Sequence, residues 1–248
     1  MAVTGLIFIG VLSVAVLIWL VLLTDGTYLG SRGVRFIYQR FARVWNLDDP
    51  GAFHGRHHTA ANAFLSRVLH EAVSQYNSPT ILDVATGTAR VPLMVASFEG
   101  FHGHVTGIDL SRNMLAKGES LVRSAGLEDR VSLIEGDGAA LGWRDGTFEV
   151  VSCIDAPLAQ PLRTIREMAR VTKPGGTIVF SKRPDSWMKL MPGKHVGTSK
   201  LEAILRKLGF DEILSETWSP SKDLMFRARK GISSKDAEQV SVSTSHGH

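Results

Sequence analysis

The chain begins with its most apolar segment. Residues 6–23 contain no charged side chain. At about 1.5 Å per residue, a helix of that length crosses the roughly 30 Å hydrocarbon layer of a bilayer. No lysine or arginine precedes this run, whereas four arginines follow it closely, which predicts a membrane protein with one span and a cytoplasmic catalytic domain. We therefore expect residues 1–24 to form a transmembrane anchor, with a cleaved secretory signal or a buried core helix as alternatives. The four arginines are Arg32, Arg35, Arg40 and Arg43.

Between residues 61 and 230, short apolar runs alternate with longer amphipathic ones. The short runs have the length of buried strands, and the longer ones have the period of helices. This alternation predicts a Rossmann-like α/β domain with a seven-stranded, mostly parallel sheet and helices on both faces. The last two strands are expected to form an antiparallel hairpin at the sheet edge. The predicted strands cover residues 80–85, 104–110, 131–137, 148–155, 177–182, 211–219 and 223–230.

Two further segments flank this domain. Residues 25–60 form a basic juxtamembrane segment, in which an amphipathic helix over residues 33–45 either lies on the membrane or packs on the domain. His54, His57 and His58 lie in the same segment without an acidic or cysteine partner at metal-ligand spacing, so we expect no metal site. Residues 231–248 have few apolar side chains and no usable period, which predicts disorder.

Composition narrows the functional classes. The 248 residues carry a formal net charge of +4, with 28 Lys+Arg against 24 Asp+Glu, far from the basic density of a dedicated nucleic-acid binder. We expect no nucleic-acid partner. The single cysteine, Cys153, cannot form an internal disulfide and falls in a predicted buried strand, where a packing role is favoured over nucleophilic catalysis.

Acidic residues close three successive predicted strands. Asp83 ends the first one, and Gly87 in the following turn lets the backbone approach a ligand. Asp109 ends the second strand, where a carboxylate can accept both hydroxyls of a ribose. Asp137 follows the third strand, where it can meet an adenine amino group. These residues predict a cofactor that contains adenosine, of either the NAD type or the adenosyl type.

Four motifs, in order, resemble those of the class I S-adenosylmethionine-dependent methyltransferases. ILDVATGTA is similar to the loop that grips the methionine part, GIDLSRNML to the ribose-binding strand end, and EGDGAALGWRDGTFEVV to the adenine-binding segment. REMARVTKPGGTIVF resembles the helix, turn and fifth strand of these enzymes. The DVATGT form is most similar to the branch of ubiquinone and menaquinone C-methyltransferases. The resemblance covers residues 79–230 and implies S-adenosyl-L-methionine as the cofactor. The cofactor-binding residues that it implies are Asp83, Ala85, Gly87, Ala89, Asp109, Leu110, Met114, Asp137 and Gly138.

Two features depart from the family pattern. Ala85 and Ala89 stand at the first and third glycine positions of the loop, and only Gly87 is kept. An alanine at the third position crowds the helix or the cofactor, which predicts weaker binding. Glu149 stands where an aspartate commonly follows the phenylalanine, and we expect it to support the strand.

The resemblance implies transfer of a methyl group from a sulfonium to an in-line acceptor. Positioning does most of this work, because a near-attack geometry contributes roughly 7 to 11 kcal/mol. Asp155, at the end of the fourth strand, is the candidate base for a phenolic or enolic acceptor, although it can instead cap the next helix. Tyr38 is expected to close the pocket if its helix folds over the cofactor.

A membrane anchor favours a hydrophobic small molecule or a lipid as the acceptor, either quinone-like or a phospholipid. Two other hypotheses remain. One is a catalytically inactive, membrane-tethered scaffold that binds the cofactor or its product, and Ala89 favours it slightly. The other is an NAD-dependent oxidoreductase, which the missing spaced glycines after Asp83 and the KPGG segment disfavour.

Overall fold

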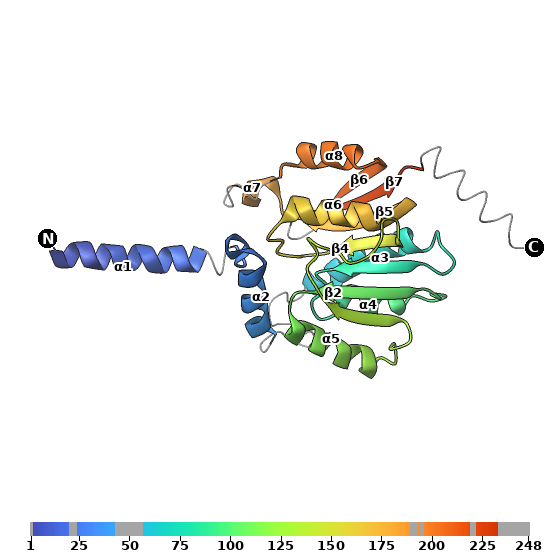
Figure 1. Cartoon of the computed structure of the whole chain (residues 1–248), viewed down its shortest axis with the longest axis horizontal. Helices are drawn as coiled ribbons and strands as arrows, with labels where there is room; N and C mark the ends of the chain where they lie inside the picture. Colours follow the sequence, from blue (N-terminus) through green and yellow to red (C-terminus); the bar gives the residue numbers. More distant parts are fainter. Residues whose placement is uncertain are drawn as a thin grey trace, which may run out of the picture.

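The computed structural model describes residues 2–19, 24–42, 57–188, 193, 196–218 and 222–232. Its helices, shown in Figure 1, are α1 (Ala2–Ile18), the 3-10 helix η2 (Thr27–Leu29), α2 (Gly30–Phe41), α3 (His57–Val73), α4 (Arg90–Ala96), α5 (Arg112–Ser124), α6 (Pro161–Val171), α7 (Asp185–Met188) and α8 (Thr198–Lys207). Its strands are β1 (Thr80–Val84), β2 (His104–Asp109), β3 (Val131–Glu135), β4 (Phe148–Cys153), β5 (Thr172–Lys182), β6 (Phe210–Trp218) and β7 (Asp223–Lys230).

The seven strands form one mixed sheet in the order β3-β2-β1-β4-β5-β7-β6. The first five strands pair in parallel, so their carboxyl ends meet at one edge. β7 runs antiparallel between β5 and β6. The predicted Rossmann-like sheet and its terminal hairpin are therefore confirmed. The strand order reverses between β1 and β4, and open α/β sheets bind ligands beside such a reversal.

Glu149 ties three neighbouring strands together. Its Oε2 accepts a hydrogen bond from Thr80 N at 2.8 Å, which joins β4 to β1. Its Oε1 is paired with Lys173 Nζ on β5. The carboxylate therefore supports the sheet, which is the role expected from its position in the motif.

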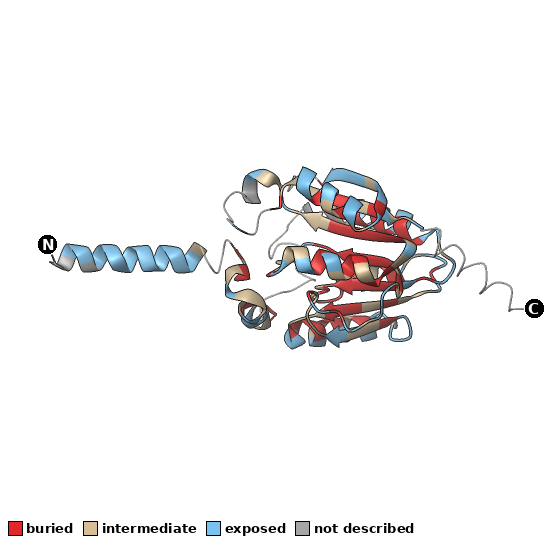
Figure 2. Cartoon of the chain, turned by 45° about the horizontal axis from the view of Figure 1, so that its top comes forward, coloured by how far each residue is buried: buried red, intermediate tan, exposed pale blue. Residues whose placement is uncertain are grey.

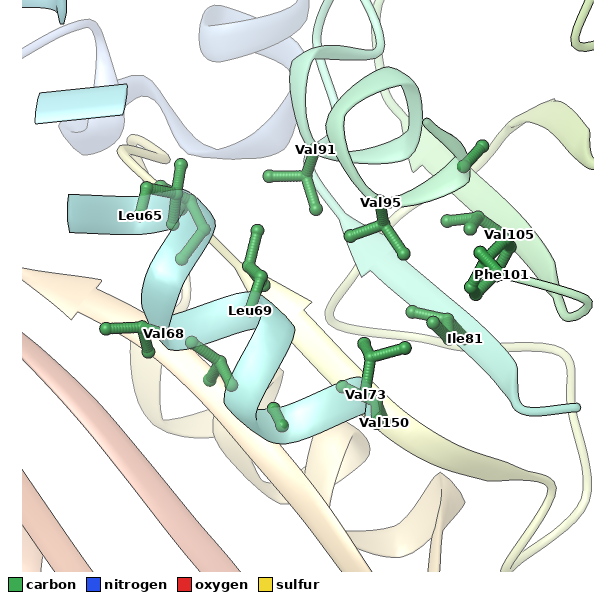
Figure 3. Packing of buried hydrophobic residues seen from close by; sticks show 14 of the residues in the cluster. Leu65, Val68, Leu69, Val73, Ile81, Val91, Val95, Phe101, Val105 and Val150 are labelled. Carbon is green, nitrogen blue, oxygen red and sulfur yellow. The ribbon is translucent and has the colours of Figure 1, made fainter. Parts of the chain in front are cut away.

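Successive side chains of the strands point into two apolar layers, because a strand alternates its faces. Ile81 packs with α3 and α4 on one face, and Leu82 packs with α6 and α8 on the other. Figure 3 shows Leu65, Leu69 and Val73 of α3 directed toward β1 and α4. Burying one such side chain completely contributes roughly 1.5 to 3 kcal/mol. Figure 2 shows that the buried residues concentrate in the sheet and on the inner faces of its helices.

Helix α1 stands apart from this domain. It projects away from the sheet in Figure 1, and its described side chains are exposed or nearly so in Figure 2. The helix contains 17 residues and ends at Ile18, before the apolar run of the sequence does, so it measures about 26 Å against the roughly 30 Å of a hydrocarbon layer.

No helix among the described residues is long and apolar enough to cross a membrane. The predicted single-pass membrane localisation, with an N-terminal anchor and a cytoplasmic catalytic domain, is therefore corrected. The described helix α1 contains 17 residues, fewer than the roughly 20 that a spanning helix needs.

Helix α2 packs on the domain, which decides between the two alternatives for the amphipathic segment. Val34 and Ile37 are buried on its inner face. Asn113 Nδ2 donates to the carbonyl oxygen of Gln39 at 2.9 Å, and Lys117 Nζ donates to that of Ala42 at 3.1 Å, both from α5. These contacts place α2 between α1 and the sheet (Figure 1).

Two sequence predictions fall outside the described parts of the structure. His54 lies outside the described residues, as do the side chains of His57 and His58. The predicted disordered tail lies outside them from residue 233 onward. In the part of the chain that the structure does describe, no cluster of three or more histidine, cysteine or acidic side chains is placed to hold a metal.

Candidate active site

The loop after β1 adopts an unusual backbone conformation at three alternate residues. Ala85 and Gly87 have φ of 57°, and Ala89 has φ of 66°. This left-handed region suits glycine and costs about 1 to 2 kcal/mol for a residue with a Cβ. The three positions are the ones where the family pattern has glycines, so the two alanines carry strain that a glycine would not.

Asp109 joins this loop to the end of β2. Its Oδ2 accepts a hydrogen bond from Gly87 N at 2.8 Å, and its Oδ1 accepts one from Ser111 N at 2.8 Å. Burial raises the pKa of Asp109, and these backbone donors lower it again in part. The structure therefore brings together the two residues that the sequence placed at the methionine and ribose ends of a cofactor.

Asp83 lies beneath the loop and does not reach its surface. Its side chain is only 2% exposed, and Ser152 Oγ on β4 donates to its Oδ1 at 2.6 Å. Burial raises the pKa of Asp83 to about 7, against a smaller lowering by the Ser152 hydroxyl. The geometry gives Asp83 a supporting place under the turn, and its direct contact with a cofactor stays a prediction.

Asp137 receives a contact that the sequence did not indicate. Ser31 Oγ on α2 donates to Asp137 Oδ2 at 2.8 Å, while Ala139 N donates to Oδ1 at 2.9 Å. A carboxylate has about four acceptor positions, so Asp137 keeps room for a further donor. At the next residue, a Cβ on Gly138 would overlap Val84, so glycine is needed for the backbone to pass β1. No local pattern signals Ser31, because its partner lies 106 residues away.

The remaining predicted cofactor residues begin α5. Ser111 caps this helix, with its Oγ accepting from Met114 N at 3.3 Å. Met114 is 2% exposed and packs into the core, whereas Leu110 is partly exposed at the strand end. Leu110 is therefore open to a ligand, while for Met114 the structure shows a packing role.

Asp155, the predicted base, is held by partners on both sides. Its Oδ2 is 3.1 Å from Arg90 Nη1, and its backbone N donates to Ser181 Oγ at 2.7 Å. Its φ of 53° places it in the left-handed region just after β4. A catalytic role for Asp155 stays a prediction. Nearby, burial raises the pKa of the Cys153 thiol, which agrees with a packing role for this residue.

A pocket of about 120 Å³ opens at the carboxyl ends of β4 and β5. Most of its wall is apolar and comes from α6, α8 and the segment after β4, and three residues before α2 close it. We call it the acceptor pocket. Its lining residues are Thr24, Asp25, Thr27, Cys153, Ala156, Pro157, Leu158, Pro161, Ile165, Met168, Phe180, Ser181, Lys182, Arg183, Val196 and Leu201. No local pattern in the sequence indicates this pocket, because its wall combines residues 24–27 with residues 153–201.

Tyr38 connects the cofactor loop with the acceptor pocket. Burial is the main cause that raises the pKa of its hydroxyl, and the nearby Asp25 and Asp109 carboxylates add to it, while Arg183 opposes them. The Tyr38 side chain therefore lies near charged residues of both the loop and the pocket. Its expected role in closing the pocket stays a prediction.

The residues of the loop fit S-adenosylmethionine. A Cβ added to Gly87 would meet no atom within 4 Å, so this part of the backbone borders open space. Asp109 stands at the edge of that space through its bond to Gly87 N, and Asp137 lies at the next strand end. The loop, Asp109 and Asp137 follow one another across the sheet, in the order in which the family resemblance predicts contacts with the methionine, ribose and adenine parts of the cofactor.

Similarity to known proteins agrees with this geometry. Residues 81–176 match the methyltransferase domain family. Demethylmenaquinone methyltransferases from Bacillus pumilus and Listeria welshimeri are 39% and 41% identical over 100 residues, which is 40% of this chain and 42% of each relative. The chain thus matches about two fifths of the length of these curated relatives.

Solved structures share the fold. The (4+2)-cyclase SpnF superposes with a TM-score of 0.69 at 22% identity, over 82% of this chain and 97% of that protein. A SAM-dependent methyltransferase from Methanosarcina mazei superposes with a TM-score of 0.54 at 20% identity, over 67% and 98%.

These similarities confirm the resemblance seen in the motifs. Residues 81–176 match a methyltransferase domain, and the fold is shared with solved structures that include a SAM-dependent methyltransferase.

Proposed function

We propose that this protein transfers the methyl group of S-adenosylmethionine to a hydrophobic small molecule with an aromatic hydroxyl group, such as a reduced quinone. The observation that carries this proposal is the acceptor pocket, which is mostly apolar and opens at the carboxyl ends of β4 and β5, the edge of the sheet at which β1 leads into the cofactor loop. Binding sites for such molecules are concave and apolar with a few placed polar groups. The names of the demethylmenaquinone methyltransferases support the same class of acceptor.

The chain's own residues do three things in this reaction. The loop at Gly87 and the carboxylates of Asp109 and Asp137 hold the cofactor, which supplies an electrophilic methyl group when bound. The apolar wall around Met168 and Phe180 orients the acceptor and keeps water out. Helix α2, bonded to Asp137 through Ser31, covers the site from above the strand ends.

The first experiment measures cofactor binding by the full-length chain. Calorimetric titration with S-adenosylmethionine and S-adenosylhomocysteine is expected to show micromolar binding. The Gly87→Ala variant is expected to lose it, because the new Cβ enters the space that borders the loop. Gly100→Ala is the matched control, since Gly100 also has positive φ (71°) and open space around it but lies before β2, at the opposite edge of the sheet.

Both glycine variants lose about 1 to 2 kcal/mol of unfolding free energy from backbone strain, so a selective loss of binding in Gly87→Ala identifies the site. Absence of binding by a folded wild-type chain contradicts the proposal.

The second candidate function is a binding scaffold without catalysis. The strained alanines at positions 85 and 89 favour it, because they depart from the glycines of the family loop. SpnF, a similar fold named as a cyclase, also shows that the fold does not by itself fix methyl transfer. Cofactor binding without transfer of a radiolabelled methyl group to reduced naphthoquinones or to phospholipids would favour the scaffold.

A further inference from the structure

The turn before η2 forms the polar end of the acceptor pocket. Asp25 and Thr27 line the pocket beside Arg183, which follows β5. Arg183 Nη2 donates to Asp25 Oδ2 at 2.9 Å and so ties the N-terminal segment to the end of β5. Most of the remaining wall is apolar, so a polar group on a bound molecule is directed to this end.

Thr27 gives an independent sign that a polar ligand group binds here. Its side chain is 3% exposed, and its Oγ1 has no hydrogen-bond partner among the residues that the structure describes. Buried hydroxyl groups are almost always paired in folded proteins, and an unpaired one calls for an explanation. A ligand hydroxyl or oxyanion in the acceptor pocket would supply the missing partner.

The backbone holds Asp25 in place. Asp25 has φ of 50° and Gly26 has φ of 68°, both in the left-handed region. A Cβ on Gly26 would overlap the side chain of Ile37, so this turn is packed tightly against α2. Non-glycine residues in that region cluster at functional sites, where the surroundings impose the conformation.

Asp25 also lies between the two halves of the site. Tyr38, which is partly buried on α2, lies near the carboxylates of both Asp25 and Asp109. Asp155, in contrast, does not line the acceptor pocket and is paired with Arg90.

Resting on the proposed function, we propose that Asp25 is the catalytic base that accepts the proton of the acceptor's hydroxyl group. Arg183 and Thr27 are placed to stabilise the oxyanion that remains. The acceptor is then a weakly acidic aromatic or enolic alcohol with an apolar body.

In the proposed step, the O–H proton passes to the Asp25 carboxylate, and the electron pair left on oxygen moves into the ring. A ring carbon forms a bond to the methyl carbon while the methyl–sulfur bond breaks, and its electron pair stays on sulfur. The ring carbon then loses its own proton as the hydroxyl group is restored, so one proton in total leaves to solvent.

The other charged or titratable residues that line the pocket with Asp25 are Cys153 of β4, and Lys182 and Arg183 at the end of β5. Lys182 is itself paired with Asp185, and Tyr38 of α2 lies nearby. Burial raises the pKa of the Cys153 thiol and of the Tyr38 hydroxyl, so neither is a good base near neutral pH. Lysine and arginine side chains offer donors and no acceptor, which leaves the Asp25 carboxylate.

The test uses the full-length chain, a prenylated 1,4-naphthoquinol kept reduced, and cofactor with a tritiated methyl group. Asp25→Asn keeps the shape of the side chain and its contact with Arg183 but removes the base. We expect kcat to fall about 100-fold or more, and S-adenosylhomocysteine to bind within about threefold of wild type. Residual activity should rise about tenfold per pH unit below the acceptor's own pKa, because only ionised acceptor then reacts.

A second acceptor separates a base from a structural residue. A nitro-substituted naphthol is already ionised at pH 8, so wild type and Asp25→Asn should methylate it at similar rates. Asp145→Asn is the matched control, because Asp145 Oδ1 accepts from Arg170 Nη1 at the same 2.9 Å but lies outside the pocket wall. We expect Asp145→Asn to match wild type with both acceptors. Asp155→Asn in the same assay tests the competing base.

Each outcome supports or overturns the proposal. If the wild type is active and Asp25→Asn has the same kcat and pH profile, Asp25 is not the base. The proposed function is then unaffected. If Asp25→Asn loses equal activity with the naphthoquinol and with the nitro-substituted naphthol, the substitution has displaced the bound acceptor and has not removed a base. That result also overturns the role of Asp25. If Asp25→Asn does not fold, Thr27→Val and Arg183→Gln must both weaken binding of the naphthol, and normal binding in both overturns the proposal. A wild type that binds no cofactor, or transfers no methyl group to either acceptor, overturns the proposed function together with this inference.

Discussion

The cofactor loop and the acceptor pocket lie at the same edge of one sheet, yet they are built in opposite ways. The cofactor half comes from short consecutive motifs, in which Gly87 and Asp109 are 22 residues apart and joined by one hydrogen bond. The acceptor half joins residues from distant parts of the chain, as in the ion pair between Asp25 and Arg183, 158 residues apart. The residues of the cofactor half can be predicted from the sequence because its motifs are local. The residues of the acceptor half cannot, because tertiary contacts bring them together.

The two halves are alike in how they hold buried hydroxyl groups. In the cofactor half, the buried carboxylates have internal donors: Asp83 accepts from Ser152, and Asp109 accepts from two backbone N–H groups. Each half nevertheless contains a buried hydroxyl oxygen without a partner within the described residues, Thr86 Oγ1 in the cofactor loop and Thr27 Oγ1 at the acceptor pocket. The carboxylates of the cofactor half are therefore preorganised, whereas unpaired hydroxyl groups occur in both halves.

The largest effect is expected at Asp109, where the two roles of one carboxylate are lost together. Asp109→Asn removes the negative charge and leaves one acceptor oxygen for the two backbone donors, Gly87 N and Ser111 N, and for the expected ribose hydroxyls. Bonds to a charged group contribute about 1.5 to 3 kcal/mol each, so affinity for S-adenosylhomocysteine should fall at least about 100-fold by calorimetry. Naphthol binding in the acceptor pocket should stay within threefold, and a parallel loss of both would show that the halves are not separable.

A pH-dependent effect is expected at Asp83, which lies between the loop and β4. The folded pKa is about 7 against 3.8 as the ordinary value, so between those pH values the folded chain binds a proton that the unfolded chain has lost. The free energy of unfolding therefore falls as pH rises through this window, by about 3 kcal/mol from pH 5 to pH 8 for this group.

Asp83→Asn removes that contribution, so the wild-type curve should drop relative to the variant curve in urea titrations over the same pH range. Parallel curves would show that Asp83 is ionised in the folded protein already at pH 5.

An opposite pair of effects is expected at Thr27. Thr27→Val replaces a buried hydroxyl that lacks an internal partner by an apolar group of the same shape, which should raise the free energy of unfolding by about 1 kcal/mol. The same change should weaken binding of the aromatic hydroxyl ligand. Denaturation and naphthol titration of one variant measure both effects, and a loss of stability would show that the hydroxyl is satisfied inside the protein.

The smallest effect is expected at the strained loop. Ala85→Gly relieves the cost of a Cβ at φ 57° but increases the freedom of the unfolded chain, so the free energy of unfolding should rise by less than about 1 kcal/mol. Cofactor affinity should stay equal or increase. A clear loss of affinity would show that the Ala85 methyl group contacts the cofactor, and Ala125→Gly, at the end of α5 with φ of −88°, is the control that lacks this strain.

The prediction from sequence succeeded where a pattern and its structural cause are local. The alternation of short apolar runs with longer amphipathic runs after residue 80 correctly predicted the parallel strands. Strands that are buried on both faces need continuous apolar segments. The same reasoning failed at the N-terminus. An uncharged run predicted a membrane span, but the described helix ends at Ile18 and is too short to cross.

The sequence by itself determined the sheet, the family and the positions of Asp83, Gly87 and Asp109, because each depends on strand ends and turns that are encoded within a few residues. Only the tertiary structure decided that α2 covers the site through Ser31, and that Asp25 meets Arg183 at the acceptor pocket. Those contacts depend on how segments far apart in the chain are brought together by packing, and no periodicity within either segment records the partner.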